Sequence, residues 1–180
     1  ASAGTSNLRL GVNAGNSIES GGNNNVCVGD EAGTALTTGD ENTFVGHASG
    51  DAVDRGKNNV AVGKNALSTE VFGCRSVAVG HAALFNQTFS SETNVLNVAV
   101  GFSAGATITS GANNTLIGGS AGGGINTGDQ NTIVGTNAGD ALTTGNKNVA
   151  VGKDALTGGT TADGNTAIGF EALKIANITT

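Results

Sequence analysis

The 180-residue chain contains no Pro, Met, Trp or Tyr, and its only aromatic residues are six Phe. Charged residues make up only 12% of it, about half the usual share. The lack of Pro and of a Gly-x-y period excludes collagen, and the low charge with evenly spread apolar residues excludes a charged disordered chain. No apolar run approaches the ~18 residues of a membrane span. The first residues also lack the basic and apolar regions of a signal peptide.

Cations and cysteines are scarce as well. Eight Lys and Arg against fourteen Asp and Glu give a net charge of −6, which disfavours nucleic acid as a partner. Two cysteines, Cys27 and Cys74, are too few for a disulfide framework, and we expect both to be small buried apolar residues. The absence of an initiator Met is typical of a processed chain or an excised fragment.

A repeat fills the chain. Units such as NVAVG and NTAIG end in a closing glycine, and the position numbers of successive closing glycines differ by 18, 17, 17, 17, 21, 17, 17, 17 and 17. The closing glycines are Gly11, Gly29, Gly46, Gly63, Gly80, Gly101, Gly118, Gly135, Gly152 and Gly169. A 17-residue unit is too short for a helical hairpin and suits one coil of a β-solenoid. The sequence therefore predicts a single all-β domain over residues 1–180, a parallel β-solenoid of ten coils.

Each coil is predicted to hold two short strands. The first is the N-T-A-V-G segment, rich in β-branched residues, and the second is centred on A-L-T-T, as in residues 35–38 and 141–144. The residue before each closing glycine is always Val, Leu or Ile, which predicts an inner ladder. The Asn that opens nine of the ten units is expected to hydrogen-bond its stacked neighbours.

The row two residues before the closing glycine is apolar in nine coils, the exception being Arg9. Because neighbouring strand residues face opposite sides, this row is predicted to point away from the inner ladder. A strand that is apolar on both faces is buried on both, so we expect this row to line a symmetric interface between chains. The predicted trimer-interface residues are Phe44, Ala61, Ala78, Ala99, Leu116, Ile133, Ala150 and Ala167. The alternative is that the small Ala residues of this row are simply tolerated at the surface. The larger apolar members, Phe44, Leu116 and Ile133, disfavour that alternative.

The units resemble two related groups of repeats. NTAIGFEAL, from Asn165 to Leu173, and LTTGNKNVAVGKDAL, from Leu142 to Leu156, are similar to the 17-residue repeats of phage tail fibres and to the head repeats of trimeric autotransporter adhesins. The resemblance covers nearly the whole chain. It implies a left-handed β-roll that assembles as a homotrimer, in an extracellular virion fibre or at a bacterial cell surface. A structural or host-attachment role follows from it, with a surface glycan or receptor protein as the further partner.

No constellation for catalysis, metal binding or cofactor binding emerges, so an enzyme is not predicted. His47 and His81 share the position after the closing glycine, about 10 Å apart, and Lys64 lies between them, so we expect two exposed side chains rather than a metal pair. The acids form no calcium loop, and the glycine-rich segment 118–124 lacks the Lys and Ser or Thr of a phosphate-binding loop.

Two features are candidates for recognition. The insertion QTFSSETN, at residues 87–94, breaks the 17-residue spacing and is predicted to bulge outward, with Phe89, Ser90, Ser91 and Glu92 as a contact point for a receptor, glycan or neighbouring fibre. A neutral surface loop is the alternative. The Thr-rich second strand leaves open a monomeric ice- or glycan-binding solenoid, although Asp54, Phe72 and Phe89 interrupt its rows.

Overall fold

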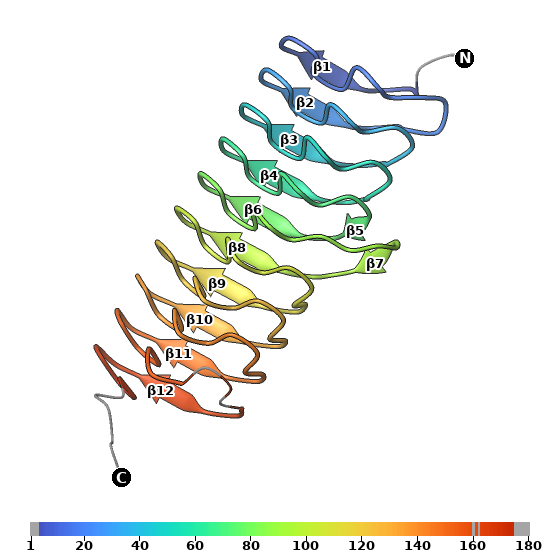
Figure 1. Cartoon of the computed structure of the whole chain (residues 1–180). Helices are drawn as coiled ribbons and strands as arrows, with labels where there is room; N and C mark the ends of the chain where they lie inside the picture. Colours follow the sequence, from blue (N-terminus) through green and yellow to red (C-terminus); the bar gives the residue numbers. More distant parts are fainter. Residues whose placement is uncertain (1–3, 160, 162, 175–180) are drawn as a thin grey trace.

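The computed structural model describes residues 4–159, 161 and 163–174 and shows a parallel β-solenoid (Figure 1). Ten three-residue strands form one parallel sheet with β1 and β12 at its edges, and a second sheet pairs only β5 with β7. The strands of the large sheet are β1 (Leu8–Leu10), β2 (Val26–Val28), β3 (Thr43–Val45), β4 (Val60–Val62), β6 (Val77–Val79), β8 (Val98–Val100), β9 (Thr115–Ile117), β10 (Thr132–Val134), β11 (Val149–Val151) and β12 (Thr166–Ile168). The small sheet joins β5 (Gly73–Cys74) to β7 (Thr93–Asn94).

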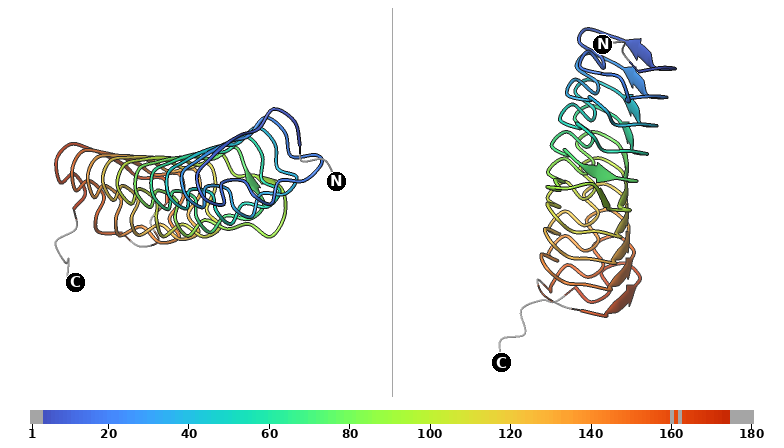
Figure 2. Two further views of the ribbon diagram at one scale, coloured as in Figure 1. Left: turned by 90° about the horizontal axis from the view of Figure 1, so that it is seen from above. Right: turned by 90° about the vertical axis from the view of Figure 1, so that its right-hand side faces the viewer.

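The repeat sets the register of this stack. Equivalent positions of successive units pair directly, as Phe44 with Ala61 between β3 and β4 and Ile133 with Ala150 between β10 and β11. One turn of the chain therefore corresponds to one repeat unit, and the predicted β-solenoid is confirmed. The strands line one side of the stack along its whole length (Figure 2).

The predicted second strand is absent from the described residues. Residues 35–38 and 141–144 form turns and bends. Within one coil the Leu36 N–H donates to the Gly33 carbonyl at 3.1 Å, whereas Ala35 and Thr37 donate to the next coil. Alternate residues thus hydrogen-bond within the coil, which prevents a regular strand at these positions, and the ten-stranded sheet is built from the first strand of each coil.

The structure reverses the predicted inside and outside of the strands. In the large sheet from β2 to β12, the middle residue of each strand points into the chain's own interior, whereas Arg9 of the edge strand β1 is exposed. The residues predicted to line the trimer interface are therefore buried in the core, and that assignment is wrong. All of Phe44, Ala61, Ala78, Ala99, Leu116, Ile133 and Ala150 are 0% exposed, and Ala167 is 2% exposed. The Val and Ile row predicted to be the inner ladder is on the outer face, where Val100, Ile117 and Ile168 are exposed.

The interior is narrow, and side-chain volumes compensate each other across it. A large middle residue is matched by Gly six positions later, as in Phe44 with Gly50 and Ile133 with Gly139, where an added Cβ would lie 2.7 Å and 3.0 Å from the larger side chain. Coils with a small middle residue place Leu there instead: Ala61 with Leu67, Ala78 with Leu84, and Ala150 with Leu156. In the exceptional pair Ala99 and Gly105, Leu116 and Leu84 from neighbouring coils approach Gly105.

This compensation predicts a coupled pair of substitutions. Ile133→Ala is expected to destabilise the fold by about 2–5 kcal/mol by leaving a cavity, and Gly139→Leu by about 1–3 kcal/mol by crowding Ile133. The double variant recreates the Ala150–Leu156 arrangement of the next coil and should recover at least about 1 kcal/mol of the summed loss. Denaturant unfolding of the four proteins measures this coupling, and strictly additive losses would contradict it.

The buried asparagines hydrogen-bond as the sequence predicted. The Asn114 backbone N–H donates to Asn97 Oδ1 at 2.8 Å, its Nδ2 donates to the Gly128 carbonyl at 2.9 Å, and its Oδ1 accepts from the Asn131 N–H at 2.9 Å. Each amide thus joins its own coil to both neighbours. The members that are 0% exposed are Asn25, Asn42, Asn59, Asn97, Asn114, Asn131 and Asn148. This ladder supplies hydrogen-bond partners to polar groups that burial would otherwise leave unsatisfied.

Candidate functional surface

The outer side of the ten-stranded sheet is a continuous uncharged surface. We call it the strand face and define it as the first and third residues of each of the ten strands. Sixteen of these twenty residues are aliphatic, four are Thr and none is charged. The first-residue row is Leu8, Val26, Thr43, Val60, Val77, Val98, Thr115, Thr132, Val149 and Thr166; the third-residue row is Leu10, Val28, Val45, Val62, Val79, Val100, Ile117, Val134, Val151 and Ile168.

The geometry of the strand face suits association. Ten parallel strands at ~4.8 Å spacing make it roughly 43 Å long. Its β-branched side chains have few χ1 rotamers, so ordering them at an interface costs little entropy. Contiguous apolar patches of this kind usually mark interaction sites. Sequence reasoning missed this face because it considered only the rows next to the glycine. The signal was present in the other row, where nine of ten first residues are Val or Thr.

The insertion bulges as predicted and carries its own short sheet. Phe89 is half-buried, whereas Ser90, Ser91 and Glu92 are exposed, so the predicted recognition residues do lie at the surface. β7 follows them and pairs with β5 of the preceding coil. A groove of about 200 Å³ lies next to this sheet, lined by Lys57, Asn58, Cys74, Arg75, Glu92 and Asn94.

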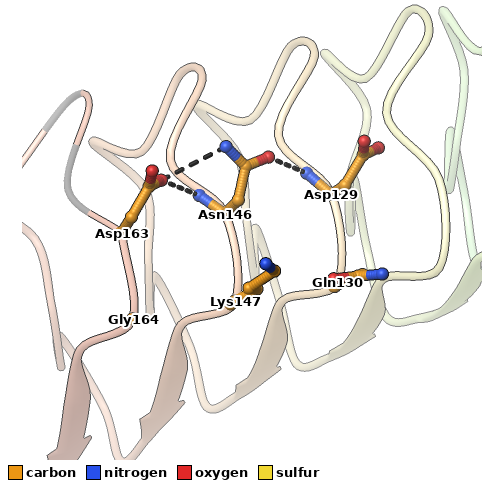
Figure 3. Close-up of a pocket in the computed structure, with 6 residues that line it drawn as sticks. All are labelled: Asp129, Gln130, Asn146, Lys147, Asp163 and Gly164. Carbon is orange, nitrogen blue, oxygen red and sulfur yellow. Dashed lines mark hydrogen bonds between the residues drawn. The ribbon is translucent and has the colours of Figure 1, made fainter.

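A second groove, of about 470 Å³, lies at the same corner of later coils (Figure 3). Its polar side chains serve the stack: Asp163 Oδ1 accepts from the Asn146 N–H at 2.6 Å, and Asn146 Oδ1 accepts from the Asp129 N–H at 2.8 Å. Asp129 Oδ1 in turn accepts from the Ala112 N–H at 2.7 Å. The row therefore satisfies the backbone of neighbouring coils, and this explains its acidic and amide residues without a ligand.

The titratable candidates are dispersed. His47 and His81 are exposed, and the His81 ring stacks on Phe102 with centroids 5.3 Å apart. Both cysteines are free and buried, and burial, partly offset by Arg9, raises the pKa of the Cys27 thiol to about 11. This thiol is therefore protonated at neutral pH and is a poor nucleophile.

Within the described ranges, no group of three or more His, Cys, Asp or Glu side chains is placed to hold a metal ion. In the same part of the chain, every buried side-chain nitrogen and oxygen has a hydrogen-bond partner. No helix long and apolar enough to cross a membrane occurs among the residues that the structure describes. Comparison with protein-family models, with curated proteins and with solved structures finds no match for this chain.

Proposed function

We propose that this chain is a structural and adhesive segment of an extracellular fibre, without catalytic activity, and that three copies assemble through the strand face. The observation that carries the proposal is the uncharged aliphatic and Thr surface that runs the length of the solenoid. A chain with a net charge of −6 keeps all its charged side chains off this face. Such a surface is covered when identical chains pack side by side around a closed symmetry axis.

The stack also suits a mechanical role. Each coil donates backbone hydrogen bonds to its neighbours, as from the Val60 N–H to the Ser76 carbonyl at 2.9 Å and from the Gly80 N–H to the Val62 carbonyl at 2.7 Å. Loading such a rod along its length engages many of these bonds together. The similarity of the units to tail-fibre and adhesin-head repeats supports this role, a left-handed coil and a place on a virion or bacterial surface.

Light scattering during gel filtration tests the assembly. We expect a particle of three times the 17.4 kDa chain mass at micromolar concentration. Val79→Asp puts a charge at the middle of the strand face and should give a folded monomer, because burying unpaired carboxylates at the interface is unfavourable. Thr144→Asp, on an exposed bend away from that face, should leave the trimer intact. A wild-type monomer of 17.4 kDa would refute the proposal.

A monomeric ice-binding solenoid is the second candidate. The strand face carries four Thr among its aliphatic residues, all in the first-residue row, which is the observation in its favour. The Thr rows first considered, at residues 37–38 and 143–144, lie in turns and bends and form no flat sheet. Thermal hysteresis from a monomer would favour this function, and its absence at high concentration would remove it.

A further inference from the structure

The groove beside the insertion differs from the regular corners of the solenoid. It is lined by Lys57, Asn58, Cys74, Arg75, Glu92 and Asn94, none of which belongs to the strand face. Two of these are cations in a chain that has only eight Lys and Arg. A groove also lies at this corner of the regular coils, but here residues 87–94 add chain, and Glu92 and Asn94 of that segment belong to the lining.

The insertion is held at both ends. At one end the buried Glu70 carboxylate accepts hydrogen bonds from the backbone N–H groups of Gly73 at 2.7 Å and Phe89 at 3.2 Å. Its other oxygen accepts from Gln87 Nε2 at 2.9 Å. At the other end, Thr93 and Asn94 pair with β5. The exposed residues 90–92 therefore span two fixed points, which lowers the entropy cost of binding a ligand there.

Glu70 and Gln87 occupy positions that hold Ile, Leu or Val in the regular coils, such as Leu36, Ile108 and Ile125. Both are 0% exposed, and Gln87 also bonds Ser76 Oγ at 3.1 Å and Asn97 Nδ2 at 2.9 Å, which bridges the break in the asparagine ladder. These two successive coils thus have a polar side chain at an interior position that is apolar in coils such as those of Leu36 and Ile108. That substitution allows the insertion without leaving buried polar groups unpaired.

Most of the charged and amide side chains of this groove are free for a ligand. In the regular groove of Figure 3, the side chains of Asp129, Asn146 and Asp163 are used by the hydrogen bonds of the stack. Here Cys74 takes that role, accepting from the Lys57 N–H at 3.3 Å. Across the described part of the chain, the side chains of Arg75, Glu92 and Asn94 make no hydrogen bond or ion pair, and Lys57 has only a 3.8 Å contact with Asp40.

We propose that the groove formed by Lys57, Arg75, Glu92 and Asn94 binds a carboxylate-bearing sugar. A planar guanidinium such as that of Arg75 pairs with a carboxylate through two parallel hydrogen bonds, and Lys57 adds a second positive charge. The amide of Asn94 and the carboxylate of Glu92 donate to and accept from sugar hydroxyl groups. Glu92 also repels multiply charged anions, so a singly charged ligand rich in hydroxyl groups fits better than phosphate or nucleic acid.

This inference rests on the attachment part of the proposed function and gives it a ligand class, a uronic or sialic acid. The groove lies within one chain, so its occupancy and the assembly are measured separately. Saccharide binding by the monomeric Val79→Asp variant would retain this site even if the fibre assembly were refuted. A trimer that does not bind the sugar acid would refute the site and leave the proposed assembly standing.

NMR titration of the full chain with glucuronic acid, N-acetylneuraminic acid, glucose and inorganic phosphate tests the site. Both sugar acids should shift the amide resonances of Arg75 and Asn94, with glucose and phosphate binding at least about tenfold more weakly. Arg75→Asn removes the guanidinium and is expected to weaken the sugar acids about tenfold, the effect of losing one charged pairing. Asn suits this corner because Arg75 has φ +64° and Asn58 has φ +58° at the equivalent place.

Lys147→Asn is the matched control, since Lys147 has φ +58° at the same corner of the regular groove in Figure 3. It removes the same charge and should leave affinity for the sugar acids within twofold of wild type. Equal weakening by both variants would show a general charge effect and overturn the proposal. So would unchanged affinity in Arg75→Asn, or phosphate binding as tight as that of the sugar acids.

Discussion

The Ile133→Asp variant is expected to lose the solenoid, with a free energy of unfolding lower by about 5 kcal/mol or more. Ile133 is 0% exposed and lies between Leu116 and Ala150 in the interior row. Removing the aliphatic side chain costs about 2–5 kcal/mol, and burying a carboxylate without a partner adds several more. The interior row itself offers no nearby cation, because Arg9, its only charged residue, lies in the edge strand β1. Circular dichroism during urea unfolding measures the loss.

Thr132→Asp is the matched control for that variant. Thr132 is the preceding residue of β10, but it is exposed on the strand face, so the same charge remains hydrated there. We expect the solenoid signal to survive in Thr132→Asp while the assembly weakens. If Ile133→Asp instead kept its fold and only dissociated the trimer, the interior placement of this row would be wrong.

Gly135→Ala is expected to destabilise the fold through two effects, backbone strain of about 1–3 kcal/mol and a collision with rigid backbone that costs a similar amount. Gly135 has φ +135°, a conformation that residues with a Cβ rarely adopt, and an added Cβ would lie 2.5 Å from the Gly152 carbonyl oxygen. Because the next coil contacts this position along the stack, the substitution forces the two coils apart. The midpoint of thermal unfolding should fall accordingly.

Gly119→Ala provides the comparison. A Cβ added at Gly119, next to the closing glycine Gly118, would meet nothing within 4 Å. We therefore expect a change within about 0.5 kcal/mol. Similar losses in both variants would mean that glycine acts here through the flexibility of the unfolded chain rather than through the close approach of the coils.

The closing glycines and the asparagines act together. Each closing glycine lets adjacent coils approach to hydrogen-bonding distance, as from the Gly135 N–H to the Ile117 carbonyl at 2.7 Å. At that distance the Asn131 N–H donates to the side chain of Asn114 at 2.9 Å. A larger residue at the glycine would therefore also lengthen the asparagine hydrogen bonds, which is a further reason to expect a large loss in Gly135→Ala.

The repeat in the sequence was enough to predict the architecture. A glycine closes each short unit, and in nine of the ten units it follows a segment with at least one β-branched residue; stacking the units as coils pairs these equivalent segments in parallel. Residues one repeat apart, such as Phe44 and Ala61, are then expected to pair between neighbouring strands. The outward bulge of the insertion at residues 87–94, exposed at residues 90–92, was predicted for the same reason, because extra residues cannot enter the coil. The prediction of a second strand was wrong because the residue pattern of the repeat does not reveal hydrogen bonds made within one coil.

Which side of each strand faces inward was decided only by the tertiary structure. The sequence showed that Ile133 and Val134 point to opposite sides, but both are apolar, so alternation alone could not identify the interior. The answer depends on the fit between distant side chains: Gly139 leaves room for Ile133, whereas Leu156 fills the space above Ala150. The groove beside the insertion likewise depends on Glu70, whose buried hydrogen bonds fix the added chain. The repeat length and the strand pairing can be read from the local sequence. Which side of a strand faces the interior is set by side-chain volume and hydrogen bonding across the closed coil.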